Sequence, residues 1–323
     1  MDFQAEKALV LDHFAALDRA EPETVADALR IRVSADYRWR GFAPFGEQSG
    51  LAIADVFWTP FKSAMTALQR RQDIFFAGLN EIDRFQTVWV CSMGHLMGLF
   101  DRPWLDIRPT GKLSFLRYAE FNRVEAGKIA ETAMFFDIPH FMAQAGQSPF
   151  AAQTGQHLVQ PGPADHGGLL SGKQDPEDGA ATLALINSMI RDLGTWESGL
   201  PLEEELAQTW RDDMLWWGPE GIGATYTIER YAQQHAAPFR AAFSDRSPTN
   251  HVCRIAEGKF GGFFGWPNFS ARMTGPFMGC PPTGQRLSFN VIDIYRREQD
   301  RLAENWVFID LMSIWRAMHG ESG

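Results

Sequence analysis

The sequence has few cysteines and no long apolar run, and each shortage excludes a class of protein. Three Cys in 323 residues (Cys91, Cys253 and Cys280) are too few and too scattered for a disulfide framework or a zinc site. No run of about 20 apolar residues occurs, so we expect no segment that spans a membrane. The N-terminus lacks the basic start and apolar core of a secretion signal, which favours a cytoplasmic protein with reduced thiols.

The sequence also lacks the motifs of common catalytic and cofactor sites. It has no phosphate-cradling Gly loop followed by Lys, no His-Glu-x-x-His and no Gly-x-Ser-x-Gly. We therefore expect neither a cofactor nor a bound metal. The formal net charge of −10 repels a phosphate backbone, which argues against nucleic acid as a partner.

Hydrophobic and aromatic side chains, in contrast, are abundant. The chain is 45% hydrophobic and contains 11 Trp and 25 Phe. This supply suffices for the cores of two domains of roughly 150 residues each. Most of these side chains are expected to fill cores, and a minority that lines an apolar cavity would bind a hydrophobic small molecule.

The composition changes near the middle of the chain. Residues 147–179 are dense in Gly, Pro, Gln, Asp and Ser and show no sustained apolar period. Such a segment is typical of a linker, which can also pack along a surface. The sequence therefore predicts one domain over 1–146 and a second over 180–323.

The two predicted domains repeat each other. Residues 36–41 (Asp-Tyr-Arg-Trp-Arg-Gly) match 213–218 (Asp-Met-Leu-Trp-Trp-Gly), 177 positions later. Residues 109–111 and 282–284 are both Pro-Thr-Gly, at an offset of 173. Collinear matches with a small drift in offset indicate that a whole domain was duplicated.

Each half begins with helical patterns and ends with strand patterns. Apolar residues recur at helical spacing over 57–68, and 227–243 is predicted to form the matching helix. Residues 87–93, 287–295 and 305–309 are β-branched and aromatic, as in strands. Helices followed by long strands predict an α+β fold, with helices packed on one face of a curved antiparallel sheet in each half.

The second half ends in an ordered set of motifs. A Gly-rich strand precedes the 282–284 turn and another strand, and then come Glu304, Trp306 and Asp310 in a strand pattern and a short helix ending at Gly320. This set resembles the C-terminal signature of SnoaL-like polyketide cyclases, in the nuclear-transport-factor-2-like superfamily. The first half repeats it less faithfully, with an apparent four-residue insertion before its own Pro-Thr-Gly turn. The resemblance implies two tandem cone-shaped α+β domains.

The resemblance also implies catalytic residues. In the family the Asp that closes the last strand is the general acid/base, and Asp137 and Asp310 stand at that position. Inside a cavity such a carboxyl would have a raised pKa and could move a proton at a carbon next to a carbonyl. Read from the residues alone, each Asp is equally suited to cap the helix that follows it. The more complete second signature favours Asp310, with Trp306 and Phe308 beside it, whereas Phe135 shares a face with Asp137.

Further candidates lie elsewhere in both halves. His95 stands near a position where the family often carries a polar residue, so it would orient a substrate oxygen or pair with Asp137; a hydrogen-bonded core histidine is the alternative. Trp39, Trp216 and Trp266 are candidate pocket walls, although each alone is more typical of a core.

One further pair of carboxylates aligns between the halves. Glu120 and Asp293 lie at an offset of 173 in a central strand. Either one facing the cavity would supply a second carboxylate there, but we expect a solvated or edge position.

Two functions from different classes fit these patterns. The first is cofactor-independent acid/base chemistry on a hydrophobic cyclic or polyketide-like small molecule, such as an aldol cyclisation or an isomerisation. The second is a small-molecule binding protein of the same fold without turnover. Because members of the superfamily pair through their sheets, the resemblance also implies an intramolecular pseudo-dimer of the two domains and leaves a further homodimer open.

Overall fold

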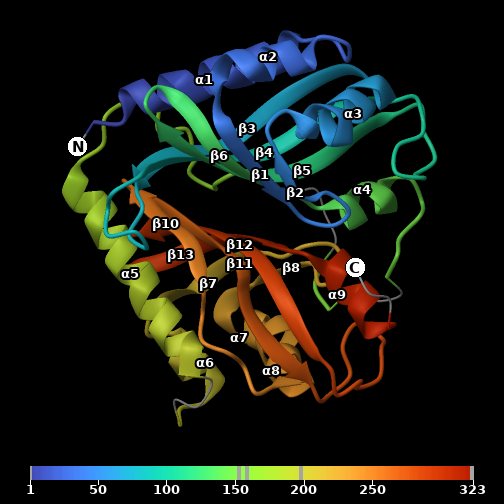
Figure 1. The fold of residues 1–323 in the computed structure, drawn as a ribbon. Coiled ribbons are helices and arrows are strands. Elements are labelled where there is room, and N and C mark those ends of the chain that lie inside the picture. Colours follow the sequence, from blue (N-terminus) through green and yellow to red (C-terminus); the bar gives the residue numbers. More distant parts are fainter. Residues whose placement is uncertain (1, 151–153, 157–159, 196–198, 321–323) are drawn as a thin grey trace. The chain divides into compact units, whose positions relative to one another are not determined.

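The computed structural model describes residues 2–150, 154–156, 160–195 and 199–320. The chain divides into two compact units (Figure 1). Unit 1 comprises Met1–Pro149 and Ala164–Lys173, and unit 2 comprises Phe150–Pro163 and Gln174–Gly323. Each unit has its own apolar core and its own sheet.

Unit 1 lays helices α1 and α2 over one face of a six-stranded sheet (Figure 1). The strand order across the sheet is β2-β1-β6-β5-β4-β3. Its elements in chain order are α1 (Gln4–Arg19), α2 (Val25–Arg32), β1 (Val33–Gly41), β2 (Gly46–Ser49), the π-helical turn η1 (Ala54–Trp58), α3 (Thr59–Ala64), β3 (Met65–Leu79), β4 (Val88–Phe100), β5 (Leu113–Glu125), β6 (Lys128–Phe136) and α4 (Ile138–Gln144).

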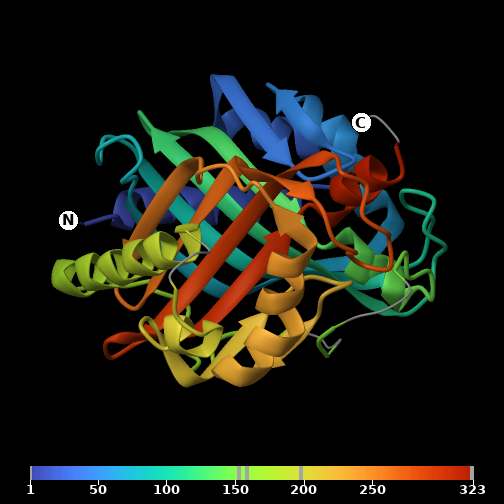
Figure 2. The ribbon, with the colours of Figure 1, turned by 90° about the horizontal axis from the view of Figure 1, so that it is seen from below.

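Unit 2 has a seven-stranded sheet in the order β10-β11-β12-β13-β7-β8, with β9 paired to β11. Figure 2 shows α5, in yellow-green, and the orange helical segment lying over its strands. Its elements are α5 (Pro176–Thr195), α6 (Leu202–Leu206), β7 (Trp210–Trp217), β8 (Ala224–Tyr226), α7 (Thr227–Tyr231), the π-helical turn η2 (Ala232–Ala236), α8 (Ala237–Ala242), β9 (Phe243–Ser244), β10 (His251–Glu257), β11 (Phe260–Met273), β12 (Arg286–Glu298), β13 (Arg301–Ile309) and α9 (Leu311–Met318).

The two units share one topology, which confirms the predicted α+β fold in tandem. Strands β1, β2, β4, β5 and β6 correspond in order and pairing to β7, β8, β11, β12 and β13. The expectation of a purely antiparallel sheet was wrong for one pair in each unit. Strand β1 runs parallel to β6, and β7 runs parallel to β13. In each unit the first strand pairs with the last strand. The chain between them, which is most of the unit, serves as the long crossover connection that a parallel pair requires.

The helix predicted over 57–68 is shorter than its pattern suggests. The turn η1 and helix α3 end at Ala64, and Met65 begins strand β3, where it pairs with Phe100 of β4. Both units place a proline, Pro60 or Pro238, just after the π-helical turn. Because proline has no N–H to continue the helical ladder, the backbone hydrogen bonds are re-routed at this point.

The predicted linker is divided between the units. Within unit 1, Leu169 forms a bridge with Phe75, and within unit 2, Gln156 forms one with Ala224. Helix α5 starts at Pro176, inside the predicted segment, with Glu177 and Asp178 in its first turn, where the helix dipole favours negative charge. The exact boundaries at 146 and 180 stay a prediction. Among the described residues, no helix is long and apolar enough to cross a membrane.

Candidate functional site

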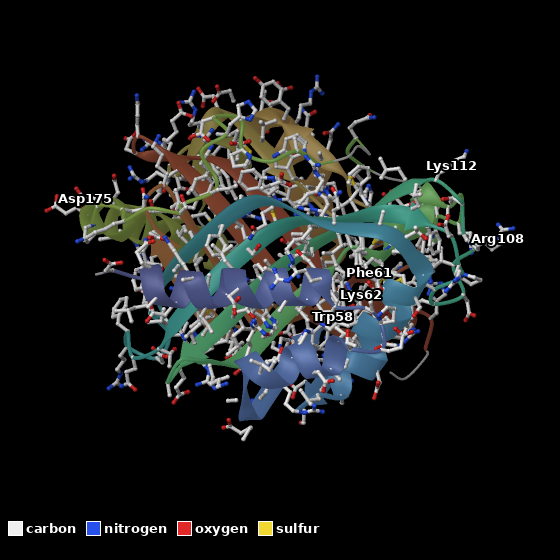
Figure 3. All side chains as sticks on the ribbon, turned by 90° about the horizontal axis from the view of Figure 1, so that it is seen from above. Trp58, Phe61, Lys62, Arg108, Lys112 and Asp175 are labelled. Carbon is white, nitrogen blue, oxygen red and sulfur yellow. The ribbon has the colours of Figure 1, made fainter. Side chains whose placement is uncertain are left out.

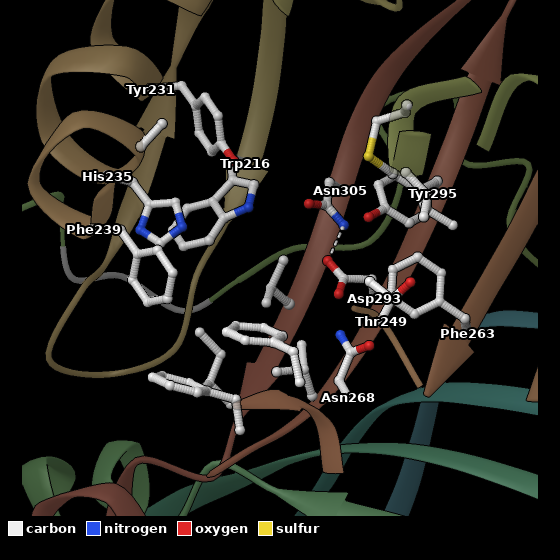
Figure 4. Close-up of a pocket in the computed structure, with 18 of the residues that line it drawn as sticks. Trp216, Tyr231, His235, Phe239, Thr249, Phe263, Asn268, Asp293, Tyr295 and Asn305 are labelled. Atoms are coloured by element: carbon white, nitrogen blue, oxygen red, sulfur yellow. Dashed lines mark hydrogen bonds between the residues drawn. The ribbon is translucent and has the colours of Figure 1, made fainter. Parts of the chain in front are cut away.

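Unit 2 has a partly open cavity of about 150 Å³ between its sheet and its helices. Figure 4 shows two kinds of wall. Trp216, Tyr231, His235 and Phe239 form an aromatic wall on one side, and Asp293 stands on the opposite side in the sheet, close to neighbouring polar side chains. The site is therefore largely apolar, with a single carboxyl group set into it.

Strand register explains why Asp293 points into the cavity. On β12, Asp293 lies opposite Val307 of β13, and Tyr295 lies opposite Asn305. Since alternate side chains of a strand share a face, these four residues point to the same side of the sheet, and all four line the cavity. Asn305 Nδ2 donates to Asp293 Oδ1 at 3.4 Å and to the carbonyl of Ile294 at 3.0 Å, so the amide is held in place (Figure 4).

The carboxyl of Asp293 has a pKa near neutral pH. Burial raises its pKa from the ordinary 3.8 to about 7, although hydrogen bonds from Asn305 and Tyr295 act in the opposite direction. In the described part of the chain no lysine or arginine forms an ion pair with it. A carboxyl that is about half ionised at neutral pH can both accept and return a proton.

The helical wall carries a second titratable group. His235 lies on η2, and its ring stacks on Trp216 with centroids 4.1 Å apart and planes at 19°. Tyr231 and Phe239 flank the same ring at 5.4 and 5.8 Å. Burial lowers the pKa of His235 to about 3, so its imidazole is neutral at physiological pH.

Arg246 and His251 are among the other nitrogen-bearing side chains that line the cavity. The guanidinium of Arg246 lies 4.4 Å above the ring of Phe269, and burial lowers the pKa of Arg246 to about 10. His251 stacks on Phe263 at 4.0 Å and accepts a hydrogen bond at Nδ1 from Arg254 at 2.8 Å. Burial lowers the pKa of His251 to about 3. The cavity thus presents neutral imidazoles and one ring-stacked cation, which suits an apolar ligand with polar atoms.

The equivalent region of unit 1 is occupied by its own side chains. Glu120 lies opposite Met134 on β6, as Asp293 lies opposite Val307 on β13. Arg70 Nη1 lies 3.0 Å from Glu120 Oε2, and its guanidinium lies 4.0 Å from the centre of the Phe14 ring. Burial raises the pKa of Glu120, and Arg70 acts against this rise.

The indole ring of Trp58 also occupies the region of unit 1 that corresponds to the cavity of unit 2. The π-helical turns correspond residue by residue, so Trp58 of η1 stands where η2 has Ala236. Figure 3 labels Trp58 together with Phe61 and Lys62 of the following helix α3. Trp58 is 3% exposed and lies 5.8 Å from the guanidinium of Arg70. Unit 1 therefore packs an ion pair and an indole ring where unit 2 has a cavity.

Both aspartates predicted to be catalytic lie at helix N-termini. Asp310 precedes α9 and accepts hydrogen bonds from Ser313, at 3.2 Å from the backbone N–H and 2.8 Å from the hydroxyl. Asp137 precedes α4, accepts from the backbone N–H of His140 at 3.2 Å, and lies 3.8 Å from Arg117 Nη1. Both are buried, and neither is among the residues that line the cavity. These contacts match the helix-capping alternative.

Of the predicted substrate contacts in unit 2, Trp216 lines the cavity. Trp306 and Phe308 alternate with Asn305, Val307 and Ile309, so they point to the opposite face of β13. Trp306 Nε1 donates to the carbonyl of Pro161 at 3.0 Å. Trp266 is half-buried in β11, where the register with β12 shifts between Gly265 and Phe269.

The predicted candidates in unit 1 make their contacts within that unit. Trp39 is 1% exposed and contacts Phe45, with ring centroids 6.1 Å apart. Phe135 stacks on Phe42 at 4.4 Å. His95 Nδ1 lies 3.4 Å from Asp73 Oδ2, so its carboxylate partner in the structure is Asp73.

Comparison with known proteins identifies a domain in the C-terminal half of the chain. A family model described as SnoaL-like polyketide cyclase matches residues 204–318. Unit 2 carries a SnoaL-like domain. No curated protein matches the sequence. Because unit 1 repeats the topology of this SnoaL-like domain, the chain is a tandem of two domains with the same topology.

Solved structures are similar to about half of the chain. A candidate SnoaL-like polyketide cyclase from Jannaschia sp. CCS1 is 16% identical, covering 47% of this chain and 100% of its own, with a TM-score of 0.40. IdmH, a candidate polyketide cyclase from Streptomyces antibioticus, is 19% identical over 43% of this chain and 98% of its own, with a TM-score of 0.34. An NTF2-like protein from Burkholderia xenovorans LB400 is 12% identical over 43% of this chain and 97% of its own, also with a TM-score of 0.34.

Sequence reasoning assigned Asp293 to a solvated or edge position, and the SnoaL-like domain instead places it inside the cavity. The available signal was its alignment with Glu120 in a central strand. His235 was not singled out at all, although it lies three residues before the repeated Pro-Phe pair at 238–239. Among the described residues, no cluster of three or more His, Cys, Asp or Glu side chains could hold a metal ion.

The ion pair in unit 1 predicts a non-additive effect on stability. An Arg70→Met variant leaves Glu120 buried without its cation, which should lower the free energy of unfolding by about 3–5 kcal/mol. Adding Glu120→Gln removes the unpaired charge and should restore most of this loss. Urea denaturation followed by tryptophan fluorescence checks both variants. Arg30→Met, which breaks an exposed pair with Asp27, serves as the control and should cost under about 1 kcal/mol. Equal losses in the single and double variants would contradict the assignment.

The raised pKa of Asp293 predicts a pH-dependent stability. Its carboxyl ionises near pH 4 in the unfolded chain and near pH 7 in the folded one, so the folded state loses stability as pH rises from about 4 to 7. An Asp293→Asn variant lacks this loss and should gain on the order of 2–4 kcal/mol relative to the wild type between pH 4 and pH 8. Thermal unfolding across this range measures the effect, with Asp212→Asn, an exposed site on β7, as the control. A constant difference between variant and wild type would show that Asp293 is not perturbed.

Proposed function

We propose that the SnoaL-like domain of unit 2 binds a hydrophobic small molecule and performs cofactor-independent acid/base chemistry on it, with Asp293 as the proton-transfer group. The observation that carries this proposal is the Asp293 carboxyl, which faces an aromatic cavity and forms no ion pair within the described residues. With a pKa of about 7, this carboxyl is present in its protonated and ionised forms in similar amounts at physiological pH, so it can act as an acid or as a base.

The arrangement supports proton transfer at a carbon next to a carbonyl. The ionised Asp293 removes that proton, the C–H bond breaks, and its electron pair moves onto the carbonyl oxygen to give an enolate. The protonated carboxyl then returns the proton to the same carbon or to a conjugated one, which gives exchange or isomerisation. In an aldol cyclisation the enolate carbon would instead attack a second carbonyl of the same molecule. Asn305 donates to one carboxyl oxygen of Asp293, and Tyr295 also hydrogen-bonds to this carboxyl, so both side chains orient it toward the cavity.

Asp310 and Asp137 have a structural role in this proposal. The bonds from Ser313 occupy both oxygens of Asp310, and the contacts of Asp137 with His140 and Arg117 occupy that carboxyl in a comparable way. Both carboxylates thereby cap the helices that follow them. Their catalytic role, expected from the family resemblance, stays a prediction that the same assay tests.

A deuterium-exchange assay tests the proposal without knowledge of the natural substrate. Small cyclic ketones, beginning with cyclohexanone, are incubated with the protein in D₂O, and NMR follows deuterium uptake next to the carbonyl. The wild type should accelerate uptake, and its rate should rise with pH through about 7 as Asp293 ionises. Asp293→Asn should lower the protein-dependent rate by at least about 100-fold, whereas Asp310→Asn, the matched control, should keep it.

Two outcomes would assign the function differently. Binding of a ketone without accelerated uptake in the wild type favours the alternative of a non-catalytic binding protein. Loss of uptake in Asp310→Asn, with folding intact and Asp293→Asn still active, returns the proton transfer to the position that the family resemblance implies.

A further inference from the structure

The cavity of unit 2 is small for a site of this kind. Its volume of about 150 Å³ is close to that of a cavity that accepts a single benzene ring. Pockets for drug-sized ligands typically measure about 300–1,000 Å³. A fused polycyclic molecule would therefore need space that the walls around Trp216 and Phe263 do not leave.

His235 faces this cavity with its hydrogen-bonding capacity unused. Stacking on Trp216 fixes the plane of its ring, and Tyr231 and Phe239 hold it from the sides. A neutral imidazole carries one N–H donor and one acceptor nitrogen. Within the described residues neither ring nitrogen of His235 forms a hydrogen bond, although His235 lines the cavity (Figure 4). A ligand with an oxygen atom would satisfy the donor.

The internal repeat links this histidine to the open cavity. The position of His235 on η2 corresponds to Phe57 on η1, because the two turns and the prolines after them align without a gap. Unit 1, which has Phe57 there, also neutralises its central carboxyl, Glu120, with Arg70. The polar ring and the unpaired carboxyl thus occur together in the unit that has the cavity.

We infer that this cavity takes a carbonyl compound of about one six-membered ring, whose oxygen accepts a hydrogen bond from His235 while Asp293 exchanges a proton at the neighbouring carbon. The inference rests on the proposed function of Asp293 and specifies its substrate class.

The placement of the two groups suits this division of tasks. His235 lies on the helical wall and Asp293 on the sheet, on opposite sides of the cavity (Figure 4). A ring between them presents its carbonyl oxygen to the imidazole and an adjacent carbon to the carboxyl. As the C–H bond breaks, negative charge grows on the carbonyl oxygen, and an N–H donor that is already in place stabilises it. The low pKa of His235 keeps its imidazole neutral. A neutral ring does not require an anionic partner, so it can hydrogen-bond to an uncharged ketone.

A matched pair of probes tests the role of the oxygen. Cyclohexanone and methylenecyclohexane have the same ring and shape, but only the ketone can accept a hydrogen bond. Ligand-observed NMR on the full chain should show that the wild type binds the ketone roughly tenfold more tightly, the usual effect of one such bond. His235→Phe, which installs the residue of unit 1, should remove this preference. His235→Gln, which keeps a donor, should retain part of it.

A bicyclic ketone tests whether the cavity is limited to a ligand of one ring. The bicyclic ketone 1-decalone should bind at least about tenfold more weakly than cyclohexanone, because its second ring exceeds the cavity. Tighter binding of 1-decalone, or no binding of cyclohexanone at millimolar concentration, would overturn the assignment of a one-ring ligand.

The variants separate this inference from the proposed function. If His235→Phe is folded by circular dichroism and still prefers the ketone, the role of His235 is wrong even when Asp293→Asn abolishes deuterium uptake. If Asp293→Asn leaves uptake unchanged while His235→Phe removes the preference, the acid/base proposal fails and the binding assignment stands.

Discussion

A carboxyl group in the middle of each sheet is the constraint around which each unit is organised. An ionised carboxylate inside a protein needs a cation, hydrogen bonds or protonation. Unit 1 meets this need with Arg70, whose guanidinium lies beside Glu120. Unit 2 supplies Asp293 with an amide from Asn305 and no ion pair among the described residues, so its pKa rises instead. The same fold thereby contains a structural carboxylate in one copy and a titratable one in the other.

The edges of the two sheets differ as well. Unit 1 has a continuous edge strand, β3, and Arg70 lies on it. In unit 2 the corresponding edge is interrupted: β9 ends at Ser244 and β10 begins at His251. The intervening loop carries Arg246 and Thr249, which line the cavity. Interrupting the strand thus leaves Asp293 without the cation that a continuous strand delivers to Glu120, and it leaves room for a ligand.

The closing aspartates make the same kind of helix cap in both units. Asp137 and Asp310 occupy equivalent positions after the last strands, and each accepts a hydrogen bond from a backbone N–H three residues on. Their repetition in both units, including the one whose cavity is filled, agrees with a role in starting α4 and α9. A position shared by both copies is explained by the fold that they share, whereas Asp293 and His235 differ between the copies and follow the cavity.

The sequence by itself determined the duplication, the α+β class and the strands of each C-terminal third, because collinear motifs and apolar periods are local properties of the chain. It could not show that β1 and β7 would lie parallel to the last strands, since strand pairing depends on distant residues. Alternation along β13 places Asn305 and Val307 on one face and Trp306 and Phe308 on the other. Both faces are buried, so burial alone does not tell which face lines a cavity. Only the tertiary structure decided which set faces the helices, and therefore that Asp293 and His235, 58 positions apart, line the same cavity.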